Sequence, residues 1–283
     1  MSALRSLLVH LDASERAEER LRVALGLART HRAEFTAMYA VSSIAAEYPF
    51  AMVGDPTTTA ALLDAEAEIR QRARASFDRV VAESDARATW LEVDLQAERA
   101  VSRQSRYADL LVLGQQDPAV ASGDGLSPRF VESVLMDSGR GALVVPHVGR
   151  PSSAAIGKIV VVAWKNTRES ARALDASLAI LQGAERVHVV CWDDDSGDRR
   201  SDETGGPIEI ERYLALHGVT ATPHRHRSVP ADVGAALLSF CADVGADLLV
   251  MGCYGHGRAR EWVLGGATRT VLHSMTLPVL LAH

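Results

Sequence analysis

A glycine-rich segment near the end of the chain holds the residues best suited to chemistry. After the apolar run ADLLVMG (246–252), the sequence continues as CYGHGR (253–258) and then reaches the small-residue cluster GGAT (265–268). Glycine lacks a Cβ atom, so an anion can approach its backbone closely, and it readily adopts positive φ, where successive N–H groups converge. The segment also enters a helical pattern, and a helix N-terminus favours negative charge. It is therefore typical of a phosphate-binding loop.

The candidate ligand-binding residues combine glycines, the start of a helix and two cationic side chains. They are Gly252, Gly255, His256, Gly257, Arg258, Gly265, Gly266, Ala267 and Thr268. His256 and Arg258 would add charge-assisted hydrogen bonds to a phosphate. The alternative, that these glycines only let a loop turn, stays open.

Two residues that follow an earlier apolar run complete this candidate site. Trp164 and Lys165 come after KIVVVA (158–163). Trp164 could stack on a base, although a tryptophan at the end of a buried strand is more often core or domain interface. The same two interpretations apply to Trp192.

Other chemistry-bearing residues give weaker signals. The run Asp193-Asp194-Asp195 favours a solvated loop over a metal site. His224-x-His226 places two rings on one strand face without an evident third ligand, so we interpret these histidines as solvated. No GxSxG, HExxH or GKS/T motif occurs, so no catalytic residue is predicted. Three cysteines without a CxxC motif predict reduced thiols, with Cys191 and Cys241 in the core and Cys253 partly exposed.

Strand-like and helix-like segments alternate along the chain. The first half has apolar strand patterns at 5–11, 35–41, 89–95, 108–114 and 142–146, and helical patterns at 15–30, 57–84, 98–107 and 128–138. The second half has strand patterns at 158–164, 186–192, 219–227, 246–252 and 277–283, and helical patterns at 168–182, 207–217, 230–244 and 259–274. Ser14 or Asp12 would cap the first helix. This order predicts an α/β fold in which each half forms a doubly wound, five-stranded parallel sheet.

The two halves also repeat in their residues. ADLLVLG (108–114) returns as ADLLVMG (246–252), and ALVVPH (142–147) returns in modified form as PVLLAH (278–283). The segment between the halves, 147–157, is rich in glycine, proline and serine, as surface linkers are. The 283 residues therefore predict two tandem domains, 1–148 and 155–283.

The composition argues against two classes of partner. The net charge of −6 does not suit a surface that neutralises nucleic-acid phosphates. No apolar run approaches the roughly 20 residues of a membrane span, and Asp12 interrupts the first apolar run before a signal-peptide core could form. We expect a cytoplasmic protein that contacts neither nucleic acid nor membrane.

On these motifs the sequence resembles the universal stress protein family in its tandem, UspA-like form. The resemblance rests on LDAS (11–14), on Gly252-x-x-Gly255 followed after nine residues by Gly265, and on the block from Gly252 to Leu281. It implies Rossmann-like sheets of the adenine nucleotide alpha hydrolase type that pair through their last strands, as in a dimer. It also implies ATP binding in many members, with an aspartate after the first strand near the adenine or ribose.

The two halves depart from the family pattern in complementary ways. The first half keeps Asp12 as a weaker candidate, but Asp117 and Arg129 stand where the signature glycines belong, so we expect a degenerate site. The second half keeps the glycines, but Lys165 replaces the carboxylate and Gly266 replaces a hydroxyl residue.

We therefore expect a stress-response protein that binds or senses at most one nucleotide, in the second domain. The ligand would be ATP or a related adenine nucleotide, with or without Mg²⁺. Slow ATP hydrolysis is the strongest enzyme activity that we consider. The alternative is a module of the same family that binds no nucleotide and acts through oligomerisation or partner contacts.

Overall fold

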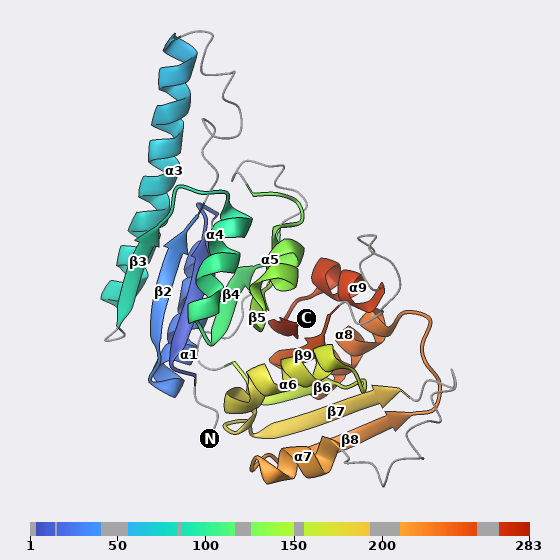
Figure 1. Ribbon diagram of the computed structural model, residues 1–283. Helices are drawn as coiled ribbons and strands as arrows, with labels where there is room; N and C mark the ends of the chain where they lie inside the picture. The colour runs from blue at the N-terminus through green and yellow to red at the C-terminus, as the bar shows by residue number, and fades with distance from the viewer. Residues whose placement is uncertain are drawn as a thin grey trace. The chain divides into compact units, whose positions relative to one another are not determined.

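The computed structural model describes residues 4–14, 16–40, 56–83, 87–116, 126–149, 156–192, 210–253 and 266–283. The chain divides into two compact units, Leu4–Ala154 and Ala155–His283, which we call the first and second unit (Figure 1).

The first unit is a parallel sheet of five strands in the order β3-β2-β1-β4-β5. The strands are β1 (Ser6–Leu11), β2 (Glu34–Tyr39), β3 (Ala88–Glu92), β4 (Leu110–Gly114) and β5 (Ala142–Val145). The helices are α1 (Ala17–His31), α3 (Pro56–Ala82), α4 (Ala97–Gln104), the 3₁₀ helix η2 (Ser105–Tyr107) and α5 (Phe130–Ser138). Helix α1 packs with α3 and α4 packs with α5, and α3 extends well beyond the sheet (Figure 1).

The second unit repeats this order as β8-β7-β6-β9-β10, again with parallel pairing. Its strands are β6 (Ile159–Ala163), β7 (Arg186–Trp192), β8 (Ala221–His226), β9 (Leu248–Gly252) and β10 (Val279–Ala282). Its helices are α6 (Arg168–Leu181), α7 (Ile210–Leu216), α8 (Val233–Val244) and α9 (Gly266–Ser274). The predicted fold class, two five-stranded doubly wound sheets, is confirmed.

The last two strands of each unit are buried, as expected for a parallel sheet whose faces are covered by helices. All residues of β5 and β10 are buried, and so are the first four residues of β4 and of β9. Burial on both faces explains why the sequences of these strands are continuous apolar runs and do not alternate between apolar and polar residues.

Helix starts follow local capping chemistry in the second unit but not at α1. Thr167 accepts a hydrogen bond from the backbone N–H of Ser170 before α6, and Asp232 accepts one from Ala235 before α8. The prediction for α1 was wrong, because Arg16 occupies the cap position and makes no side-chain cap bond. The side chains of Asp12 and Ser14 bond to each other instead.

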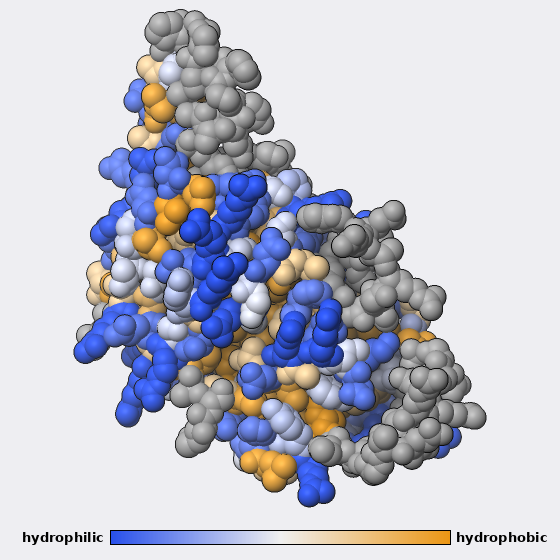
Figure 2. Space-filling model, viewed as in Figure 1, coloured by the Kyte–Doolittle hydropathy of each residue, from blue (hydrophilic) through white to orange (hydrophobic). Residues whose placement is uncertain are grey.

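The surface carries scattered apolar side chains rather than one continuous apolar area on the face seen in Figure 2. The most exposed large apolar residues of the described chain include Leu63 on α3, Tyr107 on η2 and Leu216 on α7. Single exposed apolar residues of this kind are normal in globular proteins. None of the described helices is both long and apolar enough to cross a membrane.

The topology fixes where a ligand would bind. Strand β1 lies between β2 and β4, and β6 lies between β7 and β9, so the chain order reverses at β1/β4 and at β6/β9. Ligands of open α/β sheets bind at such switch points, outside the carboxyl ends of the strands. Asp12 follows β1, and Lys165 follows β6 by two residues, so both lie at these edges.

Candidate functional site

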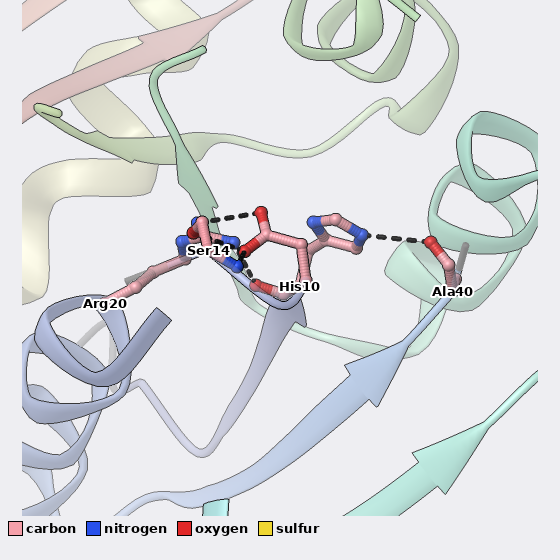
Figure 3. A network of polar contacts seen from close by, with 5 residues as sticks. His10, Ser14, Arg20 and Ala40 are labelled. Carbon is pink, nitrogen blue, oxygen red and sulfur yellow. Dashed lines mark hydrogen bonds and ion pairs between the residues drawn. The ribbon is translucent and has the colours of Figure 1, made fainter. Parts of the chain in front are cut away.

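A buried polar network occupies the switch point of the first unit (Figure 3). Asp12 is only 5% exposed. Its Oδ1 atom accepts hydrogen bonds from the backbone N–H and the hydroxyl of Ser14, at 3.0 and 2.5 Å. Its Oδ2 atom lies 3.0 Å from Nη2 of Arg20. The carboxylate is thus fully engaged within the chain.

The guanidinium of Arg20 reaches this point from the first turn of α1 and is 3% exposed. Its Nη1 donates to the carbonyl of His10 at 2.7 Å. A Cβ atom added to Gly114, at the end of β4, would lie 2.4 Å from Nη2 of Arg20 and 2.6 Å from its Cζ. The guanidinium therefore lies directly against the Gly114 backbone, between the carboxyl ends of β1 and β4.

The charges in this network are set by burial and by the ion pair. Burial alone would raise the pKa of Asp12, but the Arg20 guanidinium, His10 and the Ser14 hydrogen bonds outweigh it and hold the pKa at about 2. Burial lowers the pKa of His10 to about 4, against the attraction of Asp12. His10 is therefore neutral at pH 7, and its Nε2–H donates to the carbonyl of Ala40 across 3.1 Å.

Sequence reasoning missed Arg20, although a signal was present. We attributed the degenerate first site to Asp117, which lies outside the described residues, and to Arg129, which is exposed. Arg20 stands three residues after Ala17 and four before Ala24, both buried, so helical periodicity places it on the buried face of α1. A single arginine in an apolar helical stripe implies a buried partner, and Asp12 is that partner.

The second unit has different residues at the corresponding positions. Leu7 pairs with Leu110 and Val160 pairs with Leu248, and these two partners occupy the same place in the repeated ADLLV motif. Counting forward from Leu7 and Val160 matches Asp12 with Lys165 and Arg20 with Ala173. Lys165 is exposed, Trp164 is half-buried, and Ala173 is 1% exposed. The guanidinium that fills the first switch point has no counterpart at Ala173.

The first glycine of the predicted phosphate loop is required by packing. A Cβ atom on Gly252 would lie 2.5 Å from the backbone nitrogen of Ser170 and 2.7 Å from the carbonyl carbon of Glu169. The first turn of α6 therefore packs directly on the end of β9. Glu169 is 3% exposed there, and its carboxylate is paired with Arg168.

Cys253 was predicted to be partly exposed, and this was wrong. Its exposure is 0%, and its backbone N–H continues the sheet by donating to the carbonyl of Ala282 at 2.9 Å. Burial, together with the nearby Glu169 carboxylate, raises the pKa of the thiol. The described chain therefore remains in the protein interior for one residue beyond β9.

The small-residue cluster at the start of α9 divides into outward and inward positions. Gly266 is exposed, and a Cβ atom there would meet no atom of the described residues within 4 Å. Ala267 is half-buried, and Thr268 is 3% exposed. The first backbone N–H groups of a helix lack intrahelical partners, so the exposed start of α9 suits an anion. Gly255, His256, Gly257, Arg258 and Gly265 lie outside the described residues.

A family model named for the universal stress protein family matches residues 157–283. The second unit belongs to this family. A universal stress protein from Archaeoglobus fulgidus DSM 4304 has a similar solved structure, with a TM-score of 0.70 and 15% identity over 98% of this chain and 97% of that chain. A functionally unknown protein from Pseudomonas aeruginosa PAO1 gives 0.59 and 16% identity over 99% and 92%.

A universal stress protein solved in complex with cAMP covers 51% of this chain and 98% of its own, with 20% identity and a TM-score of 0.37. The sequence matches no curated protein. The two solved structures that match nearly the whole chain, from Archaeoglobus fulgidus and Pseudomonas aeruginosa, establish the fold of both units. The universal stress protein fold is therefore present twice.

The two histidines of β8 in this universal stress protein unit contact residues of β7. His224 Nε2 lies 3.0 Å from His188 Nδ1, and the His226 ring stacks on Trp192 at 5.7 Å between centroids. Our interpretation of these histidines as solvated was therefore wrong for His224, which is half-buried. The described residues contain no group of three metal-ligating side chains. Asp193, Asp194 and Asp195 lie outside them.

The two remaining cysteines differ in burial. Cys241 is 1% exposed, which confirms the predicted core position. Cys191 is only half-buried, because it lies near the carboxyl end of β7 rather than in its middle. The prediction of a core position for Cys191 was therefore wrong.

Proposed function

We propose that this chain is a cytoplasmic stress-response protein whose second unit binds ATP or a related adenine nucleotide. The observation that carries the proposal is the exposed start of α9, where a Cβ atom on Gly266, immediately after the glycine signature, would contact none of the described residues. Backbone N–H groups at that position can hold phosphate oxygens, and the helix dipole adds to the attraction.

The neighbouring residues support an anion at this switch point. Lys165 provides an exposed cation after β6, in the position that Asp12 occupies in the first unit. Charge-assisted hydrogen bonds from an ammonium group to phosphate are strong. Trp164 is half-buried and so presents part of its ring system to the surroundings, where an adenine could contact it. The buried carboxylate of Glu169 is compensated by Arg168 and does not act as an isolated negative charge.

The test compares Gly266→Asp with Gly266→Asn. Both side chains fit, because the Cβ position is open, and both residues are favourable near a helix start. A carboxylate there repels a phosphate whereas an amide of the same size does not. We expect the affinity for ATP, measured by calorimetry with and without Mg²⁺, to fall at least about tenfold in Gly266→Asp, or about 1.4 kcal/mol, and to change little in Gly266→Asn.

Two outcomes would reject the proposal. One is the absence of any ATP binding by the wild-type chain. The other is equal affinity of the two variants. Gly255→Asp, in the loop outside the described residues, provides an independent second variant with the same expected loss.

A module that binds no nucleotide is the second candidate, and one observation favours it. The first unit fills its own switch point with Arg20, so a unit of this chain folds with that place occupied by a side chain. Such a protein would act through self-association or protein partners, with pairing through the last strands, β5 and β10. Light scattering that finds a concentration-dependent mass, together with no heat of ATP binding, would favour this candidate.

A further inference from the structure

The first-unit switch point has the construction of a cation site. Two acceptors, the carbonyl of His10 and Oδ2 of Asp12, receive separate N–H groups of one planar guanidinium, at 2.7 and 3.0 Å. A guanidinium offers two nitrogens in a fixed planar fork, one for each acceptor, whereas an ammonium has its charge and all its donors on one nitrogen. The absence of a Cβ atom on Gly114 provides the flat space in which the guanidinium lies.

This ion pair is not a requirement of the fold. In the second unit, Lys165 takes the place of Asp12 and Ala173 the place of Arg20, so both members of the pair are replaced. The adjacent residues Leu21 and Leu174 correspond and are both buried, at 0% and 2% exposure. The same sheet and helix thus form without a guanidinium, which separates the role of Arg20 from the general packing of α1.

Arg20 also carries a buried polar atom that lacks a partner. Among the described residues, its Nε has no hydrogen-bond partner although it is inaccessible to solvent. A buried donor without a hydrogen-bond partner is unfavourable. The contacts of the two Nη atoms and the charge of the guanidinium therefore hold the side chain in place, although not all of its donors are paired. The terminal fork of the side chain is the part that the site recognises.

We propose that Arg20 is a tethered ligand. The first unit contains a guanidinium-binding site at its switch point, and the chain fills this site with its own side chain. The site takes planar amidinium-type cations, and its permanent occupant fixes the end of β1 against the start of α1 whatever the solution contains. The chain therefore combines one unit whose site is always filled with a second unit that has Ala173, not an arginine, at the position of Arg20.

The test removes the tether and supplies the cation from solution. In full-length Arg20→Ala, we expect methylguanidinium at low millimolar concentration to slow amide hydrogen exchange in β1 and α1 and to raise the unfolding midpoint by a few degrees, saturably. Methylammonium has the same charge but no fork, and we expect it to have no such effect. The wild-type chain should not respond, because its site is occupied.

Matched variants separate recognition from a general effect of the salt. Arg20→Ala combined with Asp12→Asn retains the space but lacks the carboxylate, and we expect it to lose the response. Arg172→Ala removes an arginine from the second unit, where Nη1 donates to the carbonyl of His283 at 2.7 Å, and it should behave like the wild type.

Folding of the variant does not decide the result. If Arg20→Ala folds only when methylguanidinium is present, and the double variant does not fold under the same conditions, the proposal is supported. The same methylguanidinium titration on Arg20→Met, which keeps an apolar side chain at this position, provides a second measurement of the response. Equal responses of the single and double variants, or of methylguanidinium and methylammonium, would overturn the proposal. No nucleotide enters the experiment, so its failure is distinct from failure of the proposed function.

Discussion

His10 is neutral and buried beside a charged pair, and this makes the first unit sensitive to acid. The ring is 1% exposed and lies 4.5 Å from the ring of Phe130. Burial lowers its pKa from 6.5 in the unfolded chain to about 4 in the folded unit. Between these values the unfolded chain binds more protons than the folded one, so stability increases with pH there and is lost as pH falls from 6.5 to 4.

The prediction at the residue scale is that this loss depends on His10. A pKa difference of this size corresponds to at most about 3 kcal/mol of unfolding free energy. In His10→Gln, which keeps a side-chain donor near Ala40 but does not titrate, the decrease in stability between pH 6.5 and 4.5 should be much smaller than in the wild type. Urea unfolding at both pH values measures it. An equal decrease in the two proteins would show that another group is responsible.

At lower pH, Asp12 adds a second loss with the sign expected for a carboxylate. Its pKa is lowered from 3.8 to about 2, so its ion pair with Arg20 contributes fully above pH 4 and is lost as pH falls toward 2. Acid should therefore weaken the first unit in two steps, first through His10 and then through Asp12.

Two glycines of the candidate phosphate site have different structural roles at the level of the elements. Gly252 permits α6 to contact the end of β9, whereas a Cβ atom on Gly266, at the start of α9, would contact none of the described residues. We expect Gly252→Ala to destabilise the second unit by about 1–3 kcal/mol, because its Cβ would collide with backbone atoms that cannot move separately. Gly266→Ala should be neutral or stabilising by up to about 1 kcal/mol, because alanine favours helix and nothing obstructs it.

Urea unfolding of both variants checks this prediction, with each glycine serving as the control for the other. Equal destabilisation by the two substitutions would contradict the division of tasks. So would a stabilised Gly252→Ala variant.

The helices and strands were predictable from the sequence where burial determines the structure. They were less predictable where the contacts of a single side chain determine where an element begins or ends. The run 186–192 was predicted as a strand and is β7 with the same bounds, because it is rich in valine, at Val187, Val189 and Val190. Helix α1 begins at Ala17 without the expected cap, because Asp12 and Ser14 satisfy each other before they can serve the helix. Cys253 is buried because sheet pairing continues past Gly252, which local sequence patterns do not reveal.

The candidate site was harder to predict than the fold for the same reason. Spacing of glycines marks the loop, but the role of each glycine depends on what its missing Cβ would touch. Arg20 shows this most clearly, since its contact with Gly114 joins residues that are far apart in the sequence.

For the whole molecule, the two switch points predict an unequal partition of ligand. The first holds a buried guanidinium and an engaged carboxylate, and the second has an exposed lysine and an exposed helix start. We expect calorimetric titration to saturate at one adenine nucleotide per chain, with Lys165→Ala weakening the binding and Arg129→Ala, in the first unit, leaving it unchanged. Saturation at two nucleotides per chain would contradict this partition.

The burial of the cysteines determines how readily their thiols react with oxidants. Peroxides attack thiolates that solvent can reach. Cys253 and Cys241 are 0% and 1% exposed, and burial raises the pKa of both, that of Cys241 to about 12. Neither supplies thiolate at neutral pH, and only Cys191 is partly accessible. We therefore expect the two core thiols of the second unit to remain unmodified by peroxide for as long as that unit stays folded.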